Sequence, residues 1–332
     1  MAKKAGQKIR ILFVLDILKR LSDEEHPITA EDICAELEKL GLEAERKAVY
    51  ADISALGEYG FDIIKSGYPR GFFLGAREFE EPEIYILADA VRTAKFISPV
   101  KTRELVGKLD SFLSVSRRAQ REARVYFSAN TKCENEEIFY SIDKISGAVA
   151  SGKKIEFDYV SRRLSDDRTA EKTVKHMKIS PYALVWRDDH YYVLGNYEKY
   201  DNIIHLRLDR IHSVEITKEK SRHFSEVSAY KDTFDVADYT EKLFSMHGGR
   251  VEEIELFCSA DITEQVFDRF GESIFIKNVS ENGFGFSVKA AVSEALVTWV
   301  MNYGSKIRVI SPQELVQMVT DRAKAVLDMY GE

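Results

Sequence analysis

The chain has 332 residues, with 48 Lys and Arg against 55 Asp and Glu, so its formal net charge is −7. This length suggests two or three domains with cores of their own. The 45% apolar and 31% charged residues exclude a largely disordered chain. The acidic total argues against a protein that coats nucleic acid through general positive charge, but it allows one small basic face.

The negative charge is concentrated near the C-terminus. Residues 223–332 hold 10 basic and 18 acidic side chains, a net charge of −8, so the rest of the chain sums to +1. Residues 151–222 hold 15 basic and 12 acidic side chains, a net charge of +3. Such asymmetry indicates domains with different partners. Together with the patterns below, it predicts four segments: 1–76, 77–135, 136–222 and 223–332.

Cysteine usage and hydropathy place the protein in the cytoplasm. Cys34, Cys133 and Cys258 are far apart and lack metal-ligand spacing, which is typical of reduced thiols. We therefore predict no metal and no cofactor. The apolar stretch at 9–21 is interrupted by charges, as in an amphipathic helix rather than a signal peptide. No run of about 18 apolar residues predicts a membrane helix.

The first segment predicts three helices and a hairpin. Apolar spacing gives helices near 7–22, 29–40 and 42–56, followed by short strands at 61–66 and 71–74. This order describes a winged helix-turn-helix, whose second paired helix enters the DNA major groove. The candidate DNA contacts lie on that helix and on the hairpin: Arg46, Lys47, Tyr50, Lys65 and Arg70.

The chemistry of these residues suits DNA, although a second interpretation stays open. Arg46, Lys47 and Tyr50 share one side of a helix. Arginine can pair with guanine, and lysine and tyrosine can contact phosphate. A small helical subdomain with a solvated charged face explains the residues equally well, because segment 1–75 has a net charge of −2.

The remaining segments predict a helical linker and two β-rich domains. Helices are expected at 82–97, 101–114 and 136–150, and a basic run containing Arg117, Arg118, Arg121 and Arg124 is interpreted as the solvated face of a linker helix. From residue 154 the apolar period becomes two, and several short strands suggest a small barrel or strongly bent sheet. Residues 251–330 follow a ferredoxin-like β-α-β-β-α-β order with an added helix.

Four motifs resemble the winged-helix transcriptional regulators that carry a WYL domain. The stretch Arg46-Lys47-Ala48-Val49-Tyr50-Ala51-Asp52-Ile53 resembles their recognition helix, with Ala48 where Thr or Ser is usual. Tyr191-Tyr192-Val193 stands at the eponymous Trp-Tyr-Leu, and Arg207-Leu208-Asp209-Arg210-Ile211 keeps the Arg-x-Asp-Arg-Ile element. Trp299, Gly304 and Pro312-x-x-Leu315 resemble the WCX-type extension that often follows.

The resemblance implies an α+β fold with an Sm-like small β-barrel that binds a nucleotide or nucleic-acid ligand, and an extension linked to dimer formation and gating. Residues able to bind phosphates or stack on bases are Tyr159, His176, Lys178, Tyr182, Tyr191, Tyr192, His205, Arg207 and Arg210. Because Asp209 should pair with one arginine, we favour Arg207 over Arg210 as the ligand contact. Strand alternation leaves only one of Tyr191 and Tyr192 for the ligand.

We therefore predict a homodimeric bacterial regulator, a repressor, that binds a double-stranded DNA operator and responds to a nucleotide or oligonucleotide effector. Some regulators with this domain order accompany phage-defence operons. No GxSxG, HExxH, P-loop or GxGxxG motif in its proper context is present, so we do not predict an enzyme. The alternatives are an adaptor that binds RNA or single-stranded DNA and, with less support, a nucleic-acid-processing enzyme.

Overall fold

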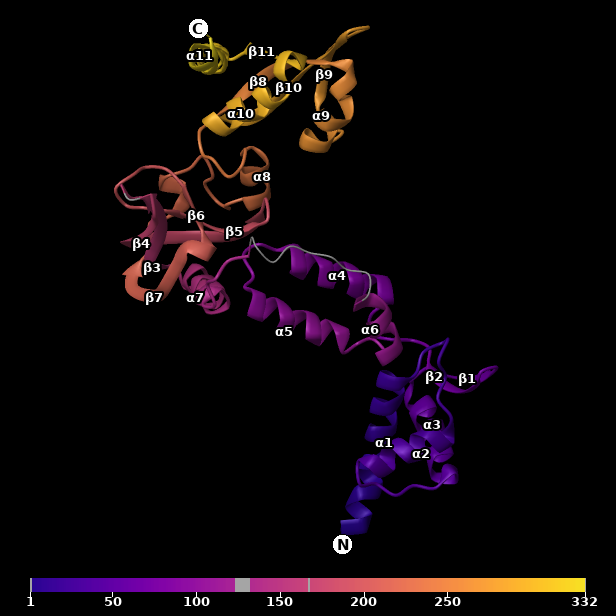
Figure 1. Ribbon diagram of the computed structural model, residues 1–332. Coiled ribbons are helices and arrows are strands. Elements are labelled where there is room, and N and C mark those ends of the chain that lie inside the picture. The colour runs from indigo at the N-terminus through magenta and orange to yellow at the C-terminus, as the bar shows by residue number, and fades with distance from the viewer. Residues whose placement is uncertain (1, 123–131, 167, 332) are drawn as a thin grey trace. The chain divides into compact units, whose positions relative to one another are not determined.

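The computed structural model describes residues 2–122, 132–166 and 168–331, in a mixed α+β arrangement (Figure 1). It divides into two compact units, Met1–Glu136 and Glu137–Glu332, which we call unit 1 and unit 2. In the described ranges, no helix is both long and apolar enough to cross a membrane.

Unit 1 begins with three helices and a hairpin, in the predicted order. These elements are α1 (Ala2–Leu21), α2 (Ala30–Lys39), α3 (Arg46–Tyr59), β1 (Ile63–Gly67) and β2 (Arg70–Leu74). Thr29 caps α2 because its hydroxyl accepts the Asp32 amide while the Asp32 carboxylate accepts the Thr29 amide. Gly60 ends α3 with a φ of 119°. Apolar residues of all three helices, including Ile17, Ile33 and Val49, are fully buried together.

The hairpin is attached to the segment that precedes α2. The Ile28 amide donates to the Phe72 carbonyl at 2.9 Å, and the Phe72 amide donates to the Ile28 carbonyl at 2.8 Å. A Cβ atom on Gly71 would lie 2.8 Å from the Ile28 carbonyl oxygen, so only glycine allows this approach. These hydrogen bonds therefore hold the hairpin against the segment before α2, in addition to its chain connection to α3.

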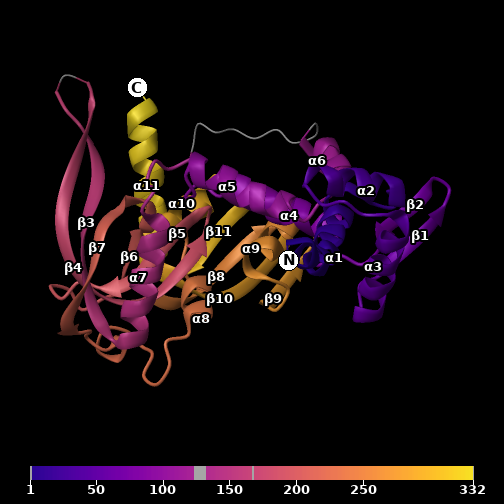
Figure 2. The same ribbon diagram turned by 90° about the horizontal axis from the view of Figure 1, so that it is seen from below.

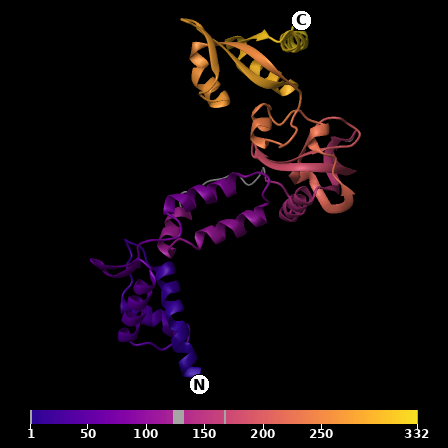
Figure 3. The ribbon, with the colours of Figure 1, turned by 180° about the vertical axis from the view of Figure 1, so that it is seen from behind.

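The rest of unit 1 is helical. It consists of α4 (Glu81–Thr93), α5 (Pro99–Asp110) and α6 (Val115–Glu122), of which α4 and α5 lie side by side (Figures 1 and 3). The Arg117 guanidinium contacts the carboxylates of Glu25 and Glu81, and Arg118 donates to the Asp110 carbonyl. This part of the basic run is bound within unit 1. The Arg121 side chain and Arg124 lie outside the described part of the chain.

Unit 2 begins with α7 (Ile138–Ser151) and an antiparallel sheet of five strands. The strands are β3 (Lys153–Leu164), β4 (Ala170–Arg187), β5 (His190–Asn196), β6 (Ile204–Arg207) and β7 (Ile211–Lys220). Their order is β6-β5-β4-β3-β7, with β6 and β7 at the two ends, so the predicted closed barrel is not confirmed. The paired strands β3 and β4 extend well beyond the other three (Figure 2).

A second antiparallel sheet follows the short helix α8 (Val236–Glu241). Its elements are β8 (Arg250–Ser259), α9 (Thr263–Phe270), β9 (Phe275–Ser280), β10 (Gly283–Val292), α10 (Glu294–Asn302), β11 (Ile307–Ser311) and the added helix α11 (Gln313–Tyr330). The strand order β11-β8-β10-β9 places β8 and β10 in the centre, where Leu256 and Phe286 are fully buried. The predicted β-α-β-β-α-β order of this segment is therefore present.

Candidate functional site

The predicted DNA contacts lie on exposed positions of α3 and the adjacent hairpin. We call Arg46, Lys47, Tyr50, Lys65 and Arg70 the α3 face; all five are exposed. The edge of the Tyr50 ring packs against Phe72 of β2, with ring centroids 5.8 Å apart, and this contact joins helix and hairpin.

One carboxylate lies beside the cations of this face. Arg46 Nη1 donates to Glu31 Oε1 at 2.5 Å, and this hydrogen bond raises the pKa of Arg46 and lowers that of Glu31. The charge of Arg70 also lowers the pKa of Glu31, which brings the hairpin cation into the same electrostatic neighbourhood. Because both side chains of the Arg46–Glu31 pair are more than half exposed, the pair is easily exchanged for another anion.

A buried ion pair fixes α3 against α1. Arg10 donates to both carboxylate oxygens of Asp52, with Nε–Oδ2 at 2.6 Å and Nη2–Oδ1 at 3.0 Å. These side chains are only 14% and 12% exposed. Asp52 belongs to the motif that resembles a recognition helix, but it faces the core of unit 1. Sequence reasoning missed this pair; the available signal was an aspartate on the apolar stripe of Val49 and Ile53.

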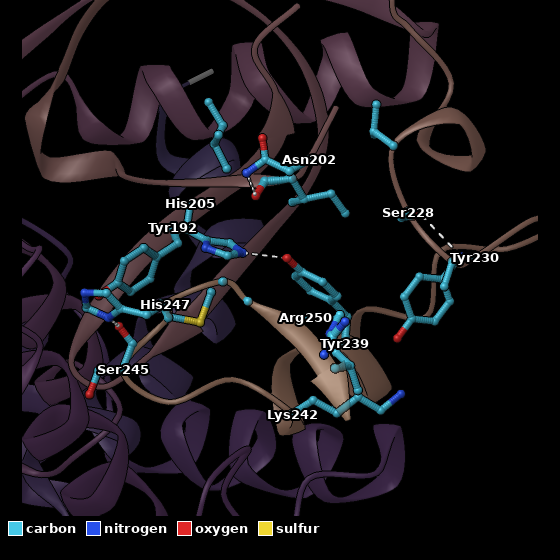
Figure 4. Close-up of a pocket in the computed structure, with 18 of the residues that line it drawn as sticks. Tyr192, Asn202, His205, Ser228, Tyr230, Tyr239, Lys242, Ser245, His247 and Arg250 are labelled. Atoms are coloured by element: carbon cyan, nitrogen blue, oxygen red, sulfur yellow. Dashed lines mark hydrogen bonds between the residues drawn. The ribbon is translucent and has the colours of Figure 1, made fainter. Parts of the chain in front are cut away.

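Unit 2 contains a cavity of about 1310 Å³ beside β5 and β6 (Figure 4). The other wall comes from the irregular segment around α8 and from the start of β8. Five of the nine predicted ligand residues line it: Tyr159, Tyr192, His205, Arg207 and Arg210. The structure thus brings together predicted ligand residues from three separate strands and from the turn after β6.

The two arginines of the Arg-x-Asp-Arg-Ile element differ in their surroundings. Asp209 binds Arg207 through both carboxylate oxygens, at 3.0 Å from Nε and 2.6 Å from Nη2, and these hydrogen bonds raise the pKa of Arg207. Arg210 is exposed, and among the described residues no carboxylate lies within ion-pair distance of it. The expectation that Asp209 leaves Arg207 unpaired for the ligand is therefore wrong, because Asp209 pairs with Arg207 and not with Arg210. Arg207 brings an oriented guanidinium to the cavity, and Arg210 brings an exposed one.

A histidine and a tyrosine form a polar pair in the cavity wall. His205 Nε2 lies 2.8 Å from the Tyr239 hydroxyl (Figure 4). Burial, followed by the nearby His247, lowers the pKa of His205 to about 4, and burial raises the pKa of Tyr239. Near neutral pH, burial therefore keeps the His205 imidazole uncharged, and His205 contributes a neutral ring to the cavity.

The opposite wall holds a group that sequence reasoning did not find. Lys242 Nζ lies 2.5 Å from Asp238 Oδ2, and the Tyr230 hydroxyl donates to the same carboxylate oxygen. Figure 4 shows Tyr230, Tyr239 and Lys242 on one side of the cavity. These residues come from α8 and its flanking irregular segment, where no periodicity marks a side chain as facing a cavity.

The other four predicted ligand residues do not line this cavity. Tyr182 donates its hydroxyl to the Arg222 carbonyl at 2.9 Å, and burial raises its pKa to about 12. His176 lies 3.1 Å from Asp158, and Lys178 lies 2.6 Å from Glu219. Tyr191 alternates with Tyr192 along β5, so only Tyr192 reaches the cavity, as strand alternation predicted.

A helical first unit, a cation- and tyrosine-lined cavity beside an antiparallel sheet, and a ferredoxin-like final sheet together define a class of multidomain α+β folds. Within that class, the family model of the WYL domain matches residues 141–216 and that of the WCX domain matches residues 250–327. Over these ranges the chain therefore carries a WYL domain followed by a WCX domain.

Comparison with solved structures gives a weaker likeness. Proteasome accessory factor B/C (PafBC) of Arthrobacter aurescens is similar over 97% of this chain, with 16% sequence identity and a TM-score of 0.28. This chain spans about half of that one, 49% of its length. No curated protein sequence matches the chain.

Proposed function

We propose that this protein is a DNA-binding transcriptional regulator whose WYL domain binds a nucleotide or oligonucleotide. The observation that carries the proposal is the cavity in unit 2, where Arg207 and Arg210 lie with Tyr159 and Tyr192. Guanidinium forks match phosphate oxygens in pairs, and tyrosine rings stack on bases. The volume of about 1310 Å³ exceeds the range of about 300–1,000 Å³ usual for small-ligand pockets, which leaves room for a nucleotide or a short oligonucleotide.

In this proposal, residues 1–76 act as a winged helix-turn-helix, with α3 as the recognition helix. Three helices, an attached hairpin and the exposed α3 face support the assignment. Arg46 and Lys47 are placed to meet bases and phosphates, and Lys65 and Arg70 to meet the backbone beside the groove. Since the segment carries a net charge of −2, affinity depends on these few cations and falls steeply with added salt.

The regulator acts as a homodimer on a pseudo-palindromic operator, because two copies of α3 then read two half-sites. The ligand controls DNA binding only if it has different affinities for the two arrangements of the dimer. We assign it the role of a repressor. Control of a phage-defence operon is the biological setting that the resemblance suggests.

A selection from random nucleic-acid pools tests the proposal. The full chain is incubated with double-stranded DNA, single-stranded DNA and RNA pools, and bound sequences are identified. Enrichment of a duplex motif with two-fold symmetry supports the regulator. Enrichment of RNA or single strands alone favours the adaptor, and strand cleavage favours an enzyme. Sedimentation of the same protein should give a dimer; a monomer at micromolar concentration contradicts the half-site arrangement.

A further inference from the structure

The outer part of the β3–β4 hairpin leaves the sheet of the WYL domain. The described β4–β5 pairing starts at Ser180, and the described β3–β7 pairing reaches Tyr159. Beyond these points β3 and β4 pair with each other, out to Leu164 and Ala170, as an extended ribbon (Figure 2). We call residues 160–175 the arm. Because two-stranded ribbons are marginally stable alone, an arm of this length invites a functional explanation.

The strand register gives the two faces of the arm different chemistry. On one face Val160 lies opposite Val174, Arg162 opposite Lys172, and Leu164 opposite Ala170. Leu164 and Val174 are 77% and 64% exposed. We call this the basic face. Its exposed apolar side chains are unusual, because exposed apolar strands invite aggregation.

The other face is polar and includes a carboxylate. Arg163 lies opposite Glu171, and the hydroxyls of Ser161 and Thr173 are hydrogen-bonded at 2.7 Å. Lys175, opposite Tyr159, adds one cation near the base of this face. The sequence 160–175 holds five basic and three acidic residues in all. On the basic face a cation therefore lies opposite a second cation, whereas on the other face a cation lies opposite a carboxylate.

We propose that the basic face of the arm binds duplex nucleic acid, as a second contact separate from the α3 face. A two-stranded ribbon fits the major groove of DNA, where Arg162 and Lys172 meet phosphates or guanine and Leu164 meets thymine methyl groups. An acidic protein surface is a less suitable partner for the basic face. A stable protein interface buries about 800 Å² per partner around an apolar centre, which a narrow ribbon with two exposed apolar side chains does not offer.

The test compares two double variants that remove the same charge from opposite faces. Arg162→Gln with Lys172→Gln alters the basic face, and Arg163→Gln with Lys175→Gln is the matched control. Affinity of the full chain for a random-sequence duplex is measured by fluorescence anisotropy over a range of salt concentrations. We expect the basic-face variant to lower the slope of log affinity against log salt by about 1–2, with a much smaller change in the control.

Two results overturn the proposal. Equal losses in both double variants mean that only the total charge of the arm matters. Unchanged duplex affinity overturns it as well, and conversion of dimer to monomer in sedimentation would then identify the arm as a contact between two copies of the chain. The exchange Arg162→Lys with Lys172→Arg keeps the charges and should retain most of the affinity, which checks that the arm still folds.

Discussion

The α3 face and the cavity of unit 2 present positive charge in opposite ways. On the α3 face, Arg46 and Lys47 project from an exposed helix, and Arg46 pairs with the exposed carboxylate of Glu31. In the cavity, Arg207 is 28% exposed and held in one orientation by Asp209. Exposed cations attract phosphate at a distance and are screened by salt, whereas an oriented guanidinium selects the shape of its ligand. The difference predicts separate responses to mutation.

Removing the cations of α3 should have the largest effect. Arg46→Ala with Lys47→Ala is expected to weaken specific duplex binding by about 2–4 kcal/mol, since a base contact and a phosphate contact are both lost. Gel-shift titration measures the effect, and oligonucleotide binding to the cavity should be unchanged. Lys39→Ala, an exposed cation on α2, serves as the control. Unchanged duplex affinity in the double variant refutes α3 as the recognition helix.

Breaking the Arg10–Asp52 ion pair beneath α3 should have the second largest effect. Asp52→Ala leaves the largely buried Arg10 without its partner, and we expect unit 1 to lose about 2–3 kcal/mol of unfolding free energy. Urea denaturation followed by circular dichroism measures the loss. Asp16→Ala breaks the exposed Arg20–Asp16 pair and should cost less than about 1 kcal/mol. Similar losses in the two variants would mean that Asp52 contributes nothing beyond a surface pair.

The cavity should respond to the orientation of Arg207 as well as to its charge. Arg207→Ala is expected to weaken binding of a mixed-sequence single-stranded oligonucleotide by about 1–3 kcal/mol, because a charged hydrogen bond is lost. Arg207→Lys keeps the charge without the fork and should rescue only part of the loss. Calorimetry gives the affinities, and duplex binding without ligand should stay near wild type. A full rescue by lysine would show that orientation has no role.

The smallest effect concerns acid stability of unit 1. Burial raises the pKa of Asp23, but hydrogen bonds from Ser114, at 2.5 Å, and His26, at 2.8 Å, outweigh it and leave the pKa below its ordinary value. A lowered carboxyl pKa stabilises the fold above the unfolded value of about 3.9, and this stabilisation is lost as the pH falls through the folded value. Asp23→Asn should therefore cost about 1–2 kcal/mol near pH 7.

The difference between wild type and Asp23→Asn should then shrink below about pH 4, as the wild-type carboxylate takes up a proton. Urea unfolding at several pH values measures it. A difference that is constant across this range would assign the loss to packing rather than to charge.

Local patterns predicted much of the fold. Apolar spacing located the N-terminal helices, and Thr29 with Asp32 marked the start of α2. Alternation located the strands of both sheets. The length of β3 and β4 escaped prediction because the arm is exposed on both faces, so no core imposes alternation on residues 160–175. The small barrel was inferred from short, closely spaced strands and from the family resemblance, and neither says which strands pair at the edges.

The site was predicted where its residues carry a motif and missed where they depend on tertiary contacts. The Arg-x-Asp-Arg-Ile element pointed to the cavity, but only the structure shows that Asp209 forms its ion pair with Arg207. Arg10 and Asp52 are 42 positions apart, a separation that no local pattern bridges. Lys242 and Tyr230 reach the cavity from an irregular segment, where side-chain direction follows from loop geometry rather than from periodicity.

The buried pair of His205 and Tyr239 has a consequence for what the protein can sense. Histidine is the side chain most often used to detect changes of acidity near neutrality. With a pKa of about 4, His205 stays uncharged throughout that range. The pair thus presents the same hydrogen-bonding surface to a ligand whatever the metabolic acidity of the cell. A change of pH near neutrality therefore leaves the charge of this part of the cavity unchanged, and binding here depends on the ligand.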